Sequence, residues 1–241
     1  MKKLSILTVA FLFSAGMAFA QSNDASIEQI GDNHEAEIEQ IGADNSSDVE
    51  VLAGSNSFLD VFQEGNGNIS VMSELRDNID AYQTQLGDDN EAYISQARQN
   101  NDITQYQDGD RNVATFEGYN TSSVRGGTYV QEQIGDDNSA EVLGANNKNT
   151  MTQYQDGDSN IASIVGSNFS QNFADMSQVG DGNEAYLELF NSAKDNSATF
   201  SQVGNDNYGF ISQSGSQFNT AAIDQNGDMN QASITQSGAV Q

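Results

Sequence analysis

The decapeptide ITQYQDGDRN, residues 103–112, decides the fold because it returns as MTQYQDGDSN at residues 151–160. Eight of the ten positions agree, although the two copies lie 48 residues apart. A catalytic loop needs only one copy, whereas a unit that stacks on itself needs many. The repetition therefore predicts that weaker copies of the same unit fill the rest of the chain.

The weaker copies share the tripeptide Gln-x-Gly, which occurs twelve times, and in nine of these an Asn follows five residues after the Gln. Successive copies lie 11 to 12 or 22 to 26 residues apart, so the basic step is about 11 residues. The longest spacing contains EGYNTSSVRGG, residues 117–127, which we interpret as a looser loop. The glutamines are Gln29, Gln40, Gln63, Gln85, Gln107, Gln133, Gln155, Gln178, Gln202, Gln213, Gln225 and Gln236.

Before each Gln, residues of similar type recur at every second position, as in Asn90, Ala92, Ile94 and Gln96. This period places the four residues on one face of a β-strand. The strands are separated by short runs such as Gly-Asp-Asp-Asn at 87–90 and 135–138, whose residues tolerate the positive φ of tight corners. The sequence therefore predicts an all-β chain with almost no helix after its first residues.

One half-unit is too small to bury a core alone, so the half-units are predicted to stack into a β-solenoid with about 22 residues per coil. About nineteen half-units fit between Ala25 and Gln236, which gives nine or ten coils. The inward Gln and Asn would then form amyloid-like amide ladders, each amide donating to one coil and accepting from another. The predicted self-assembly ladder contains the twelve glutamines above together with Gln96, Asn45, Asn68, Asn90, Asn101, Asn112, Asn138, Asn160, Asn183, Asn207 and Asn230.

The Gln ladder lapses at six positions of the alternate half-unit, where Gly144 and Gly166 suggest a thinner side built from small residues. Glu74 and Arg76 break the pattern outright and predict one irregular coil. His34 and Phe218 are interpreted as replacements for a corner Asn. The remaining lapses are at Val51, Glu74, Gly118 and Leu189.

The first twenty residues have the form of a secretory signal peptide, with Lys2 and Lys3 before an apolar run that ends in Ala18-Phe19-Ala20. The predicted organisation is a signal peptide at 1–20, a short leader at 21–24 and the repeats at 25–241. No later stretch is long and apolar enough to span a membrane. Cysteine and proline are both absent, so stability does not come from disulfides and every residue can donate to a sheet.

The chain is strongly acidic, and losing Lys2 and Lys3 with the signal peptide takes its net charge from −27 to −29. That sign excludes nucleic acid as a partner. No grouping of nucleophile, base and orienting residue stands out, so we predict no catalytic residue, no cofactor and no enzymatic activity. Asp108, Asp110 and Asn112 copy the start of an EF-hand, but Val113 and Tyr119 occupy positions that calcium loops reserve for Gly and Glu, so no metal site is predicted.

Alternating Asn-x5-Gln and Gln-x4-Asn, as in Gln85–Asn90–Gln96–Asn101–Gln107–Asn112, resembles the curlin repeat of curli subunits. This resemblance covers residues 25–241. It implies a secreted subunit that polymerises into extracellular, pilus- or fimbrium-type amyloid fibres for biofilm matrix and cell adhesion. It also implies a nucleating or companion subunit and an outer-membrane export channel as partners, in a bacterium with an outer membrane.

Two other functions stay open at the level of sequence. The first is a monomeric acidic β-solenoid with capped ends, acting as an adhesin or a calcium-binding surface protein. A cap would lose the ladder residues of the last coil, whereas Ile234, Gln236 and Gly238 are retained there. The second is an ice-binding solenoid, which would need a flatter and more regular Thr array than the outward residues provide.

Overall fold

The computed structural model describes residues 22–118, 126–145, 148–166, 170–190, 194–215 and 217–238. The predicted signal peptide and most of the predicted loop, residues 119–125, lie outside the described residues. Within these ranges the chain forms nineteen β-strands and no helix. The prediction of an all-β chain with about nineteen half-units is therefore confirmed.

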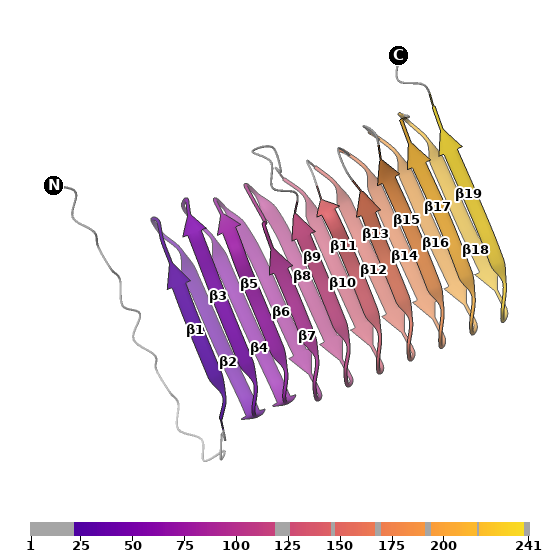
Figure 1. Cartoon of the computed structure of the whole chain (residues 1–241). Coiled ribbons are helices and arrows are strands. Elements are labelled where there is room, and N and C mark those ends of the chain that lie inside the picture. The colour runs from indigo at the N-terminus through magenta and orange to yellow at the C-terminus, as the bar shows by residue number, and fades with distance from the viewer. Residues whose placement is uncertain are drawn as a thin grey trace.

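The strands alternate between two sheets, as the odd and even numbers in Figure 1 show. The odd-numbered strands are β1 (Asp24–Gln29), β3 (Ser46–Ala53), β5 (Ile69–Arg76), β7 (Glu91–Ser95), β9 (Val113–Gly118), β11 (Ser139–Ala145), β13 (Ile161–Gly166), β15 (Glu184–Phe190), β17 (Tyr208–Ser214) and β19 (Gln231–Ser237). The even-numbered strands are β2 (Glu35–Ala43), β4 (Phe58–Asn66), β6 (Ile79–Leu86), β8 (Asn101–Asp108), β10 (Thr128–Ile134), β12 (Thr150–Asp156), β14 (Phe173–Val179), β16 (Ser197–Val203) and β18 (Thr220–Asn226).

Each strand pairs in parallel with the strand two places along the chain, so that one sheet has ten strands and the other nine. The chain thus winds as a flattened β-solenoid, two strands to a coil, with β1 and β19 at opposite ends of the stack (Figure 1). Parallel stacking in register places equivalent residues of successive coils above one another, for example Gln133 beside both Gln107 and Gln155. The predicted β-solenoid is confirmed.

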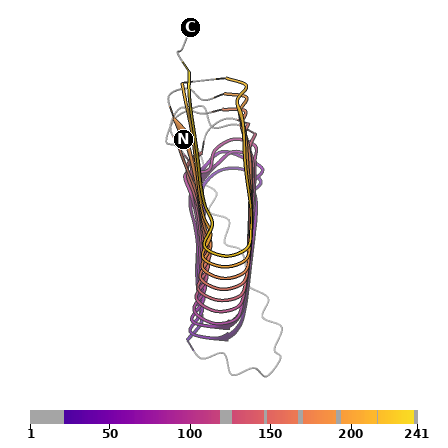
Figure 2. The same cartoon turned by 90° about the vertical axis from the view of Figure 1, so that its right-hand side faces the viewer.

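The two kinds of corner differ in regularity, as the end-on view in Figure 2 shows. First corners, which join an even strand to the next odd strand, repeat the Gly-x-x-Asn pattern. Their glycines have φ values such as 126° at Gly109 and 102° at Gly135. A Cβ built on Gly109 would lie 2.2 Å from the carbonyl oxygen of Gly135, so only glycine fits in the stack. Second corners, which join an odd strand to the next even strand, vary in length.

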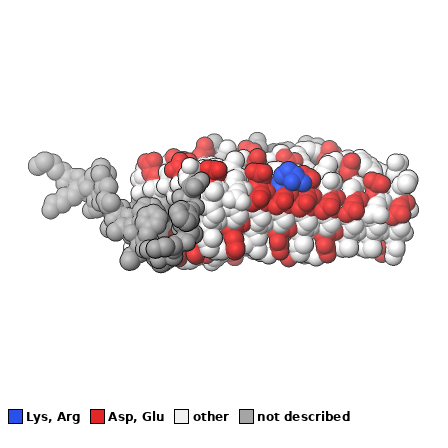
Figure 3. Space-filling view, turned by 90° about the horizontal axis from the view of Figure 1, so that it is seen from below, with Lys and Arg blue, Asp and Glu red and all other residues white. Residues whose placement is uncertain are grey.

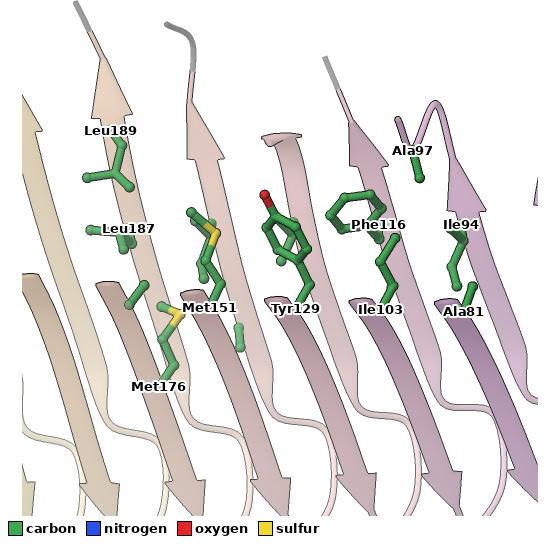
Figure 4. Packing of buried hydrophobic residues seen from close by; sticks show 14 of the residues in the cluster. Ala81, Ile94, Ala97, Ile103, Phe116, Tyr129, Met151, Met176, Leu187 and Leu189 are labelled. Atoms are coloured by element: carbon green, nitrogen blue, oxygen red, sulfur yellow. The ribbon is translucent and has the colours of Figure 1, made fainter. Parts of the chain in front are cut away.

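The core lies between the sheets and consists of the inward residues at period two (Figure 4). Phe116 of the ten-stranded sheet packs against Tyr129 of the nine-stranded sheet, with ring centroids 4.6 Å apart. The Tyr129 ring also lies over Gly127, where a Cβ would approach it to 2.4 Å. The large Tyr129 ring is therefore accommodated where glycine supplies the space.

The coil around Glu74 is irregular, as the sequence predicts. Glu74 has a φ of 54°, and the register between β3 and β5 shifts twice, so that Val51 pairs with Leu75 instead of Glu74. The bulge keeps the charged Glu74 out of the inward column and places the apolar Leu75 there, fully buried.

Candidate functional site

The most regular feature of the solenoid is a column of glutamines at the last inward position of the nine-stranded sheet, which we call the outer Gln column. Each Nε2 donates to the Oε1 of the next coil over 2.7 to 3.0 Å. The seven central members, from Gln63 to Gln202, are fully buried. The column consists of Gln40, Gln63, Gln85, Gln107, Gln133, Gln155, Gln178, Gln202 and Gln225.

The second Nε2 proton of each glutamine crosses the core to the other sheet. Gln107 donates to the Glu91 carbonyl oxygen, and Gln133 donates to that of Val113, both at 3.0 Å. Each internal amide therefore uses both protons and its oxygen. A buried amide is costly unless it is paired, so this column is stable only while the coils stay in register.

A second column lies one inward position earlier, and the sequence analysis missed it. Gln83, Gln105, Gln131 and Gln153 are linked Nε2 to Oε1 over 2.7 to 2.9 Å. We call this the middle Gln column. The sequence pattern that could have predicted this column is Gln-x-Gln, in which the second Gln belongs to the outer Gln column. It occurs in four successive strands of the nine-stranded sheet.

The first-corner asparagines form a third column. Each Oδ1 accepts the backbone N–H of the next Asn over 2.9 to 3.1 Å, as from Asn68 to Asn90 and from Asn90 to Asn112. Several Nδ2 groups also donate to the carbonyl oxygen of the corner glycine in the next coil. The column consists of Asn23, Asn45, Asn68, Asn90, Asn112, Asn138, Asn160, Asn183, Asn207 and Asn230.

A fourth, less complete column occupies the second corners. The Oδ1 of Asn101 accepts from the Gly127 N–H. Further along, each Asn Oδ1 accepts the backbone N–H of the Asn in the next coil, through the series Asn149, Asn172, Asn196 and Asn219. His34 takes the first place in this column, with its Nδ1 accepting the Ser57 N–H at 3.3 Å. The interpretation of Phe218 as the replacement for a corner Asn was wrong. In this corner the Asn follows Gln213 by six residues instead of five, so Asn219 holds the column position.

The ten-stranded sheet places a Gln at the matching column only near its ends. Gln213 Nε2 donates to Gln236 Oε1 at 2.9 Å, and Gln29 lies beside Val51 at the other end. Gln29 Nε2 and Gln213 Oε1 are buried without a hydrogen-bond partner. Gln96 lies outside the column, because β7 ends at Ser95 and Gln96 has a φ of 55°. Between Gln29 and Gln213 other residues take the place of Gln in this column, and they include Val51, Leu75, Gly166 and Leu189.

The first corners also carry a row of carboxylates, which runs along the face turned to the viewer in Figure 3. Those directly after the corner glycine are more than solvated charges, because their Oδ1 accepts a backbone N–H from the preceding coil. Asp110 accepts from Asp88, and Asp136 accepts from Asp110, both at 2.8 Å. Arg111 lies in this row and donates to both oxygens of Asp137, which lowers the pKa of that carboxyl group.

The described part of the chain offers no group of three or more His, Asp and Glu side chains that could hold a metal ion. It also contains no helix long and apolar enough to cross a membrane.

The two ends of the solenoid are open sheet edges with opposite amide polarity. At β2 the Gln40 oxygen faces outward along the stack, and at β18 the remaining Gln225 Nε2 proton does. At β19, residues 231, 233 and 235 direct their backbone groups to the open side, because Asn230 and Gly238 bond to β17. The amide donor at one end therefore matches the amide acceptor at the other, and the open backbone edges offer both donors and acceptors.

A comparison with protein-family models finds the curlin associated repeat at residues 20–50, 54–97, 170–204 and 204–238. These segments cover more than half of the sequence. The chain belongs to the curlin-repeat family. The family relationship and the solenoid agree in describing a structural protein, and they support a curli subunit. No curated protein matches the sequence.

The unmatched segment, residues 98–169, continues the same curlin-repeat solenoid. It contains β8 to β13, which stack in register with the matched strands on either side. It also holds most of the middle Gln column, where Gln replaces the apolar residue found in other coils.

Proposed function

We propose that this curlin-repeat protein is a secreted structural subunit that self-assembles end to end into extracellular curli-like amyloid fibres. The Gln and Asn columns specify the register of each added copy, and the open backbone edges supply the hydrogen bonds. The fibres would serve as biofilm matrix and in cell adhesion.

One observation carries this proposal: both ends of the solenoid present inward Ala, Ile and Gln, which are residues of the kinds that fill its interior. β19 has Ala232, Ile234 and Gln236, and β2 has Ala36, Ile38 and Gln40. These strand ends lack the features that blunt natural edges, such as proline or an inward-pointing charge. A second copy can therefore extend every column.

The same observation disfavours a capped monomeric adhesin, because a cap would replace the inward Ala, Ile and Gln of the terminal coils. Family membership adds the further expectation of a nucleating or companion subunit and an outer-membrane export channel. Together with the predicted signal peptide, it supports a location on the surface of a bacterium with an outer membrane.

The test is a variant that folds but cannot be extended, Ser233→Pro. Ser233 lies in the last strand, and its N–H faces the open side, so proline removes a docking donor without breaking a bond inside the subunit. Wild-type protein is expected to form thioflavin-binding fibres visible by electron microscopy, whereas the variant stays monomeric with a β-sheet circular dichroism spectrum.

The matched control is Ser233→Thr, which keeps the N–H and should form fibres as the wild type does. Added in small amounts to growing wild-type fibres, Ser233→Pro should also shorten them, because its intact first coil can add to an end that it then blocks. Wild-type protein that stays monomeric on prolonged incubation at high concentration would contradict the proposed function.

A further inference from the structure

The two sheets contain unequal numbers of strands, and this limits how copies can join. The ten-stranded sheet begins with β1 and ends with β19, whereas the nine-stranded sheet runs only from β2 to β18. If a second copy joined in the same orientation, its β1 would pair with β19. Each joint would then leave one empty strand position between β18 of one copy and β2 of the next.

An empty position is costly because neighbouring strands pair across only about 4.8 Å. The backbone groups of β18 that face along the stack, at Thr220, Ala222 and Asp224, would lose their partners in the next copy. The outer Gln column would be interrupted at Gln225, and the core beneath the gap would be open to water.

We infer that successive copies join with a half-turn about the fibre axis, so that β1 of the added copy pairs with β18 and its β2 pairs with β19. This inference rests on the proposed end-to-end assembly. The half-turn exchanges the two sheets between successive copies, so each sheet receives ten strands from one copy and nine from the next. No strand position stays empty, and all neighbouring strands remain parallel.

The inward residues at the ends fit this joint. Across β18 and β1, Ala221 meets Ala25, Ile223 meets Ile27, and Gln225 meets Gln29. Across β19 and β2, the inward Ala, Ile and Gln of one strand likewise meet the Ala, Ile and Gln of the other, and Gln236 meets Gln40. The Gln225 and Gln236 amides each have a proton directed along the stack, and Gln29 Oε1 and Gln40 Oε1 are the acceptors that would receive them.

This joint gives Gln29 a role that the single chain does not. Within the subunit its next neighbour is Val51, and its buried Nε2 is unpaired. The ten-stranded sheet otherwise holds column glutamines only at Gln213 and Gln236, next to the opposite end. Both sheets therefore present glutamine where copies would meet, so an added copy can exchange its sheets without losing a Gln contact.

The corner between β1 and β2 supports the same orientation. Gln29 is followed by Ile-Gly-Asp-Asn-His34, which has the Gly-Asp pattern of a first corner, although it joins an odd strand to an even strand. In the half-turn joint it stacks on Gly227-Asp228-Met229-Asn230, with Asn33 at a φ of 58° over Met229 at 55°. Other corners from an odd to an even strand lack the Gly-Asp pair.

Disulfide cross-linking of fibres distinguishes the two joints, since the chain has no cysteine. The double variant Glu39→Cys with Thr235→Cys places thiols side by side between copies in the half-turn joint. The double variant Glu28→Cys with Thr235→Cys does so only in the joint without a turn. All three positions are exposed on the outer faces of their strands, so neither variant disturbs the core.

Fibres of each variant would be oxidised and analysed on a non-reducing gel. The expected result is a ladder of covalent oligomers for the Glu39/Thr235 pair and only monomer for the Glu28/Thr235 pair. The matched control, Ser212→Cys with Thr235→Cys, joins paired residues of β17 and β19 within one copy and should oxidise without forming oligomers.

The reverse pattern, or ladders from both variants, would overturn the half-turn joint while leaving the proposed fibre intact. Fibres that cross-link with neither variant, although the control pair oxidises, would overturn any joint between these end strands. Failure of the wild type to form fibres would instead overturn the proposed function, and the half-turn joint with it.

Discussion

At the scale of the residue, stability depends on amides that are fully paired inside the core. Gln133 shows this most clearly. It accepts from Gln107, donates to Gln155 and donates across the core to the Val113 carbonyl oxygen. Its side chain is fully buried, so each of these groups would lack water if its partner were removed.

Replacing this amide by an apolar group of similar size, Gln133→Leu, should therefore lower the free energy of unfolding by about 2 kcal/mol or more. The loss arises because the substitution orphans one proton of Gln107 and the oxygen of Gln155. The urea midpoint, followed by circular dichroism in dilute protein, measures it.

The adjacent outward residue provides the control. Glu132→Gln on the same strand should change the unfolding free energy by no more than about 0.5 kcal/mol. Equal effects of the two substitutions would show that the outer Gln column adds nothing to ordinary strand packing.

At the scale of the element, stacking brings acidic residues on the outer faces of neighbouring strands together. Asp60 of β4 pairs with Glu37 of β2, and Glu39 lies nearby. Burial, followed by repulsion from Glu37 and then Glu39, raises the pKa of Asp60 above its ordinary value. The charged form of Asp60 is therefore less favourable in the folded state than in the unfolded state.

A raised carboxyl pKa destabilises the fold above the folded-state pKa and ceases to do so once the pH falls below the unfolded-state value. Asp60→Asn should therefore raise stability at pH 7, and its advantage should vanish as the pH falls below about 4. Urea midpoints of both proteins across this pH range test the prediction.

The exposed Asp102→Asn substitution on β8 is a suitable control, because it also removes one charge from the same sheet face. A benefit of Asp60→Asn that persists unchanged at pH 3 would contradict the proposed electrostatic cause.

At the scale of the whole molecule, charge opposes assembly while the open edges favour it. Each joint adds a highly acidic copy, and like charges stacked at about 4.8 Å repel by about 0.9 kcal/mol in water before screening. Salt weakens this repulsion, because the Debye length falls from about 30 Å at 0.01 M to about 8 Å at 0.15 M.

The lag time of fibre formation, followed by thioflavin fluorescence, should accordingly shorten several-fold between 0.01 and 0.15 M NaCl. Calcium chloride at matched ionic strength provides the comparison, since screening alone predicts similar kinetics for both salts. Kinetics independent of salt would contradict electrostatic control, and a much larger effect of calcium would indicate specific binding to the corner carboxylates.

The sequence predicted most of the repeating order. The period of two defined the inward face, and the recurring Gln and Asn gave the number of strands and the regular first corners. Gln96 and Phe218 show where this reasoning failed. Both matched the spacing, but Gln96 turns out of its strand and Asn219 takes the position assigned to Phe218.

The sequence by itself determined that the chain is a stack of half-units with amides inside, because side chains alternate between the two faces of any strand. Only the tertiary structure decided the exact register between half-units of the same sheet, because corners of unequal length obscure the alignment. That pairing placed Gln83 to Gln153 in one middle column, made the corner carboxylates acceptors for the preceding coil, and left ten strands facing nine. These features depend on which backbone lies above which, and a linear spacing does not specify that.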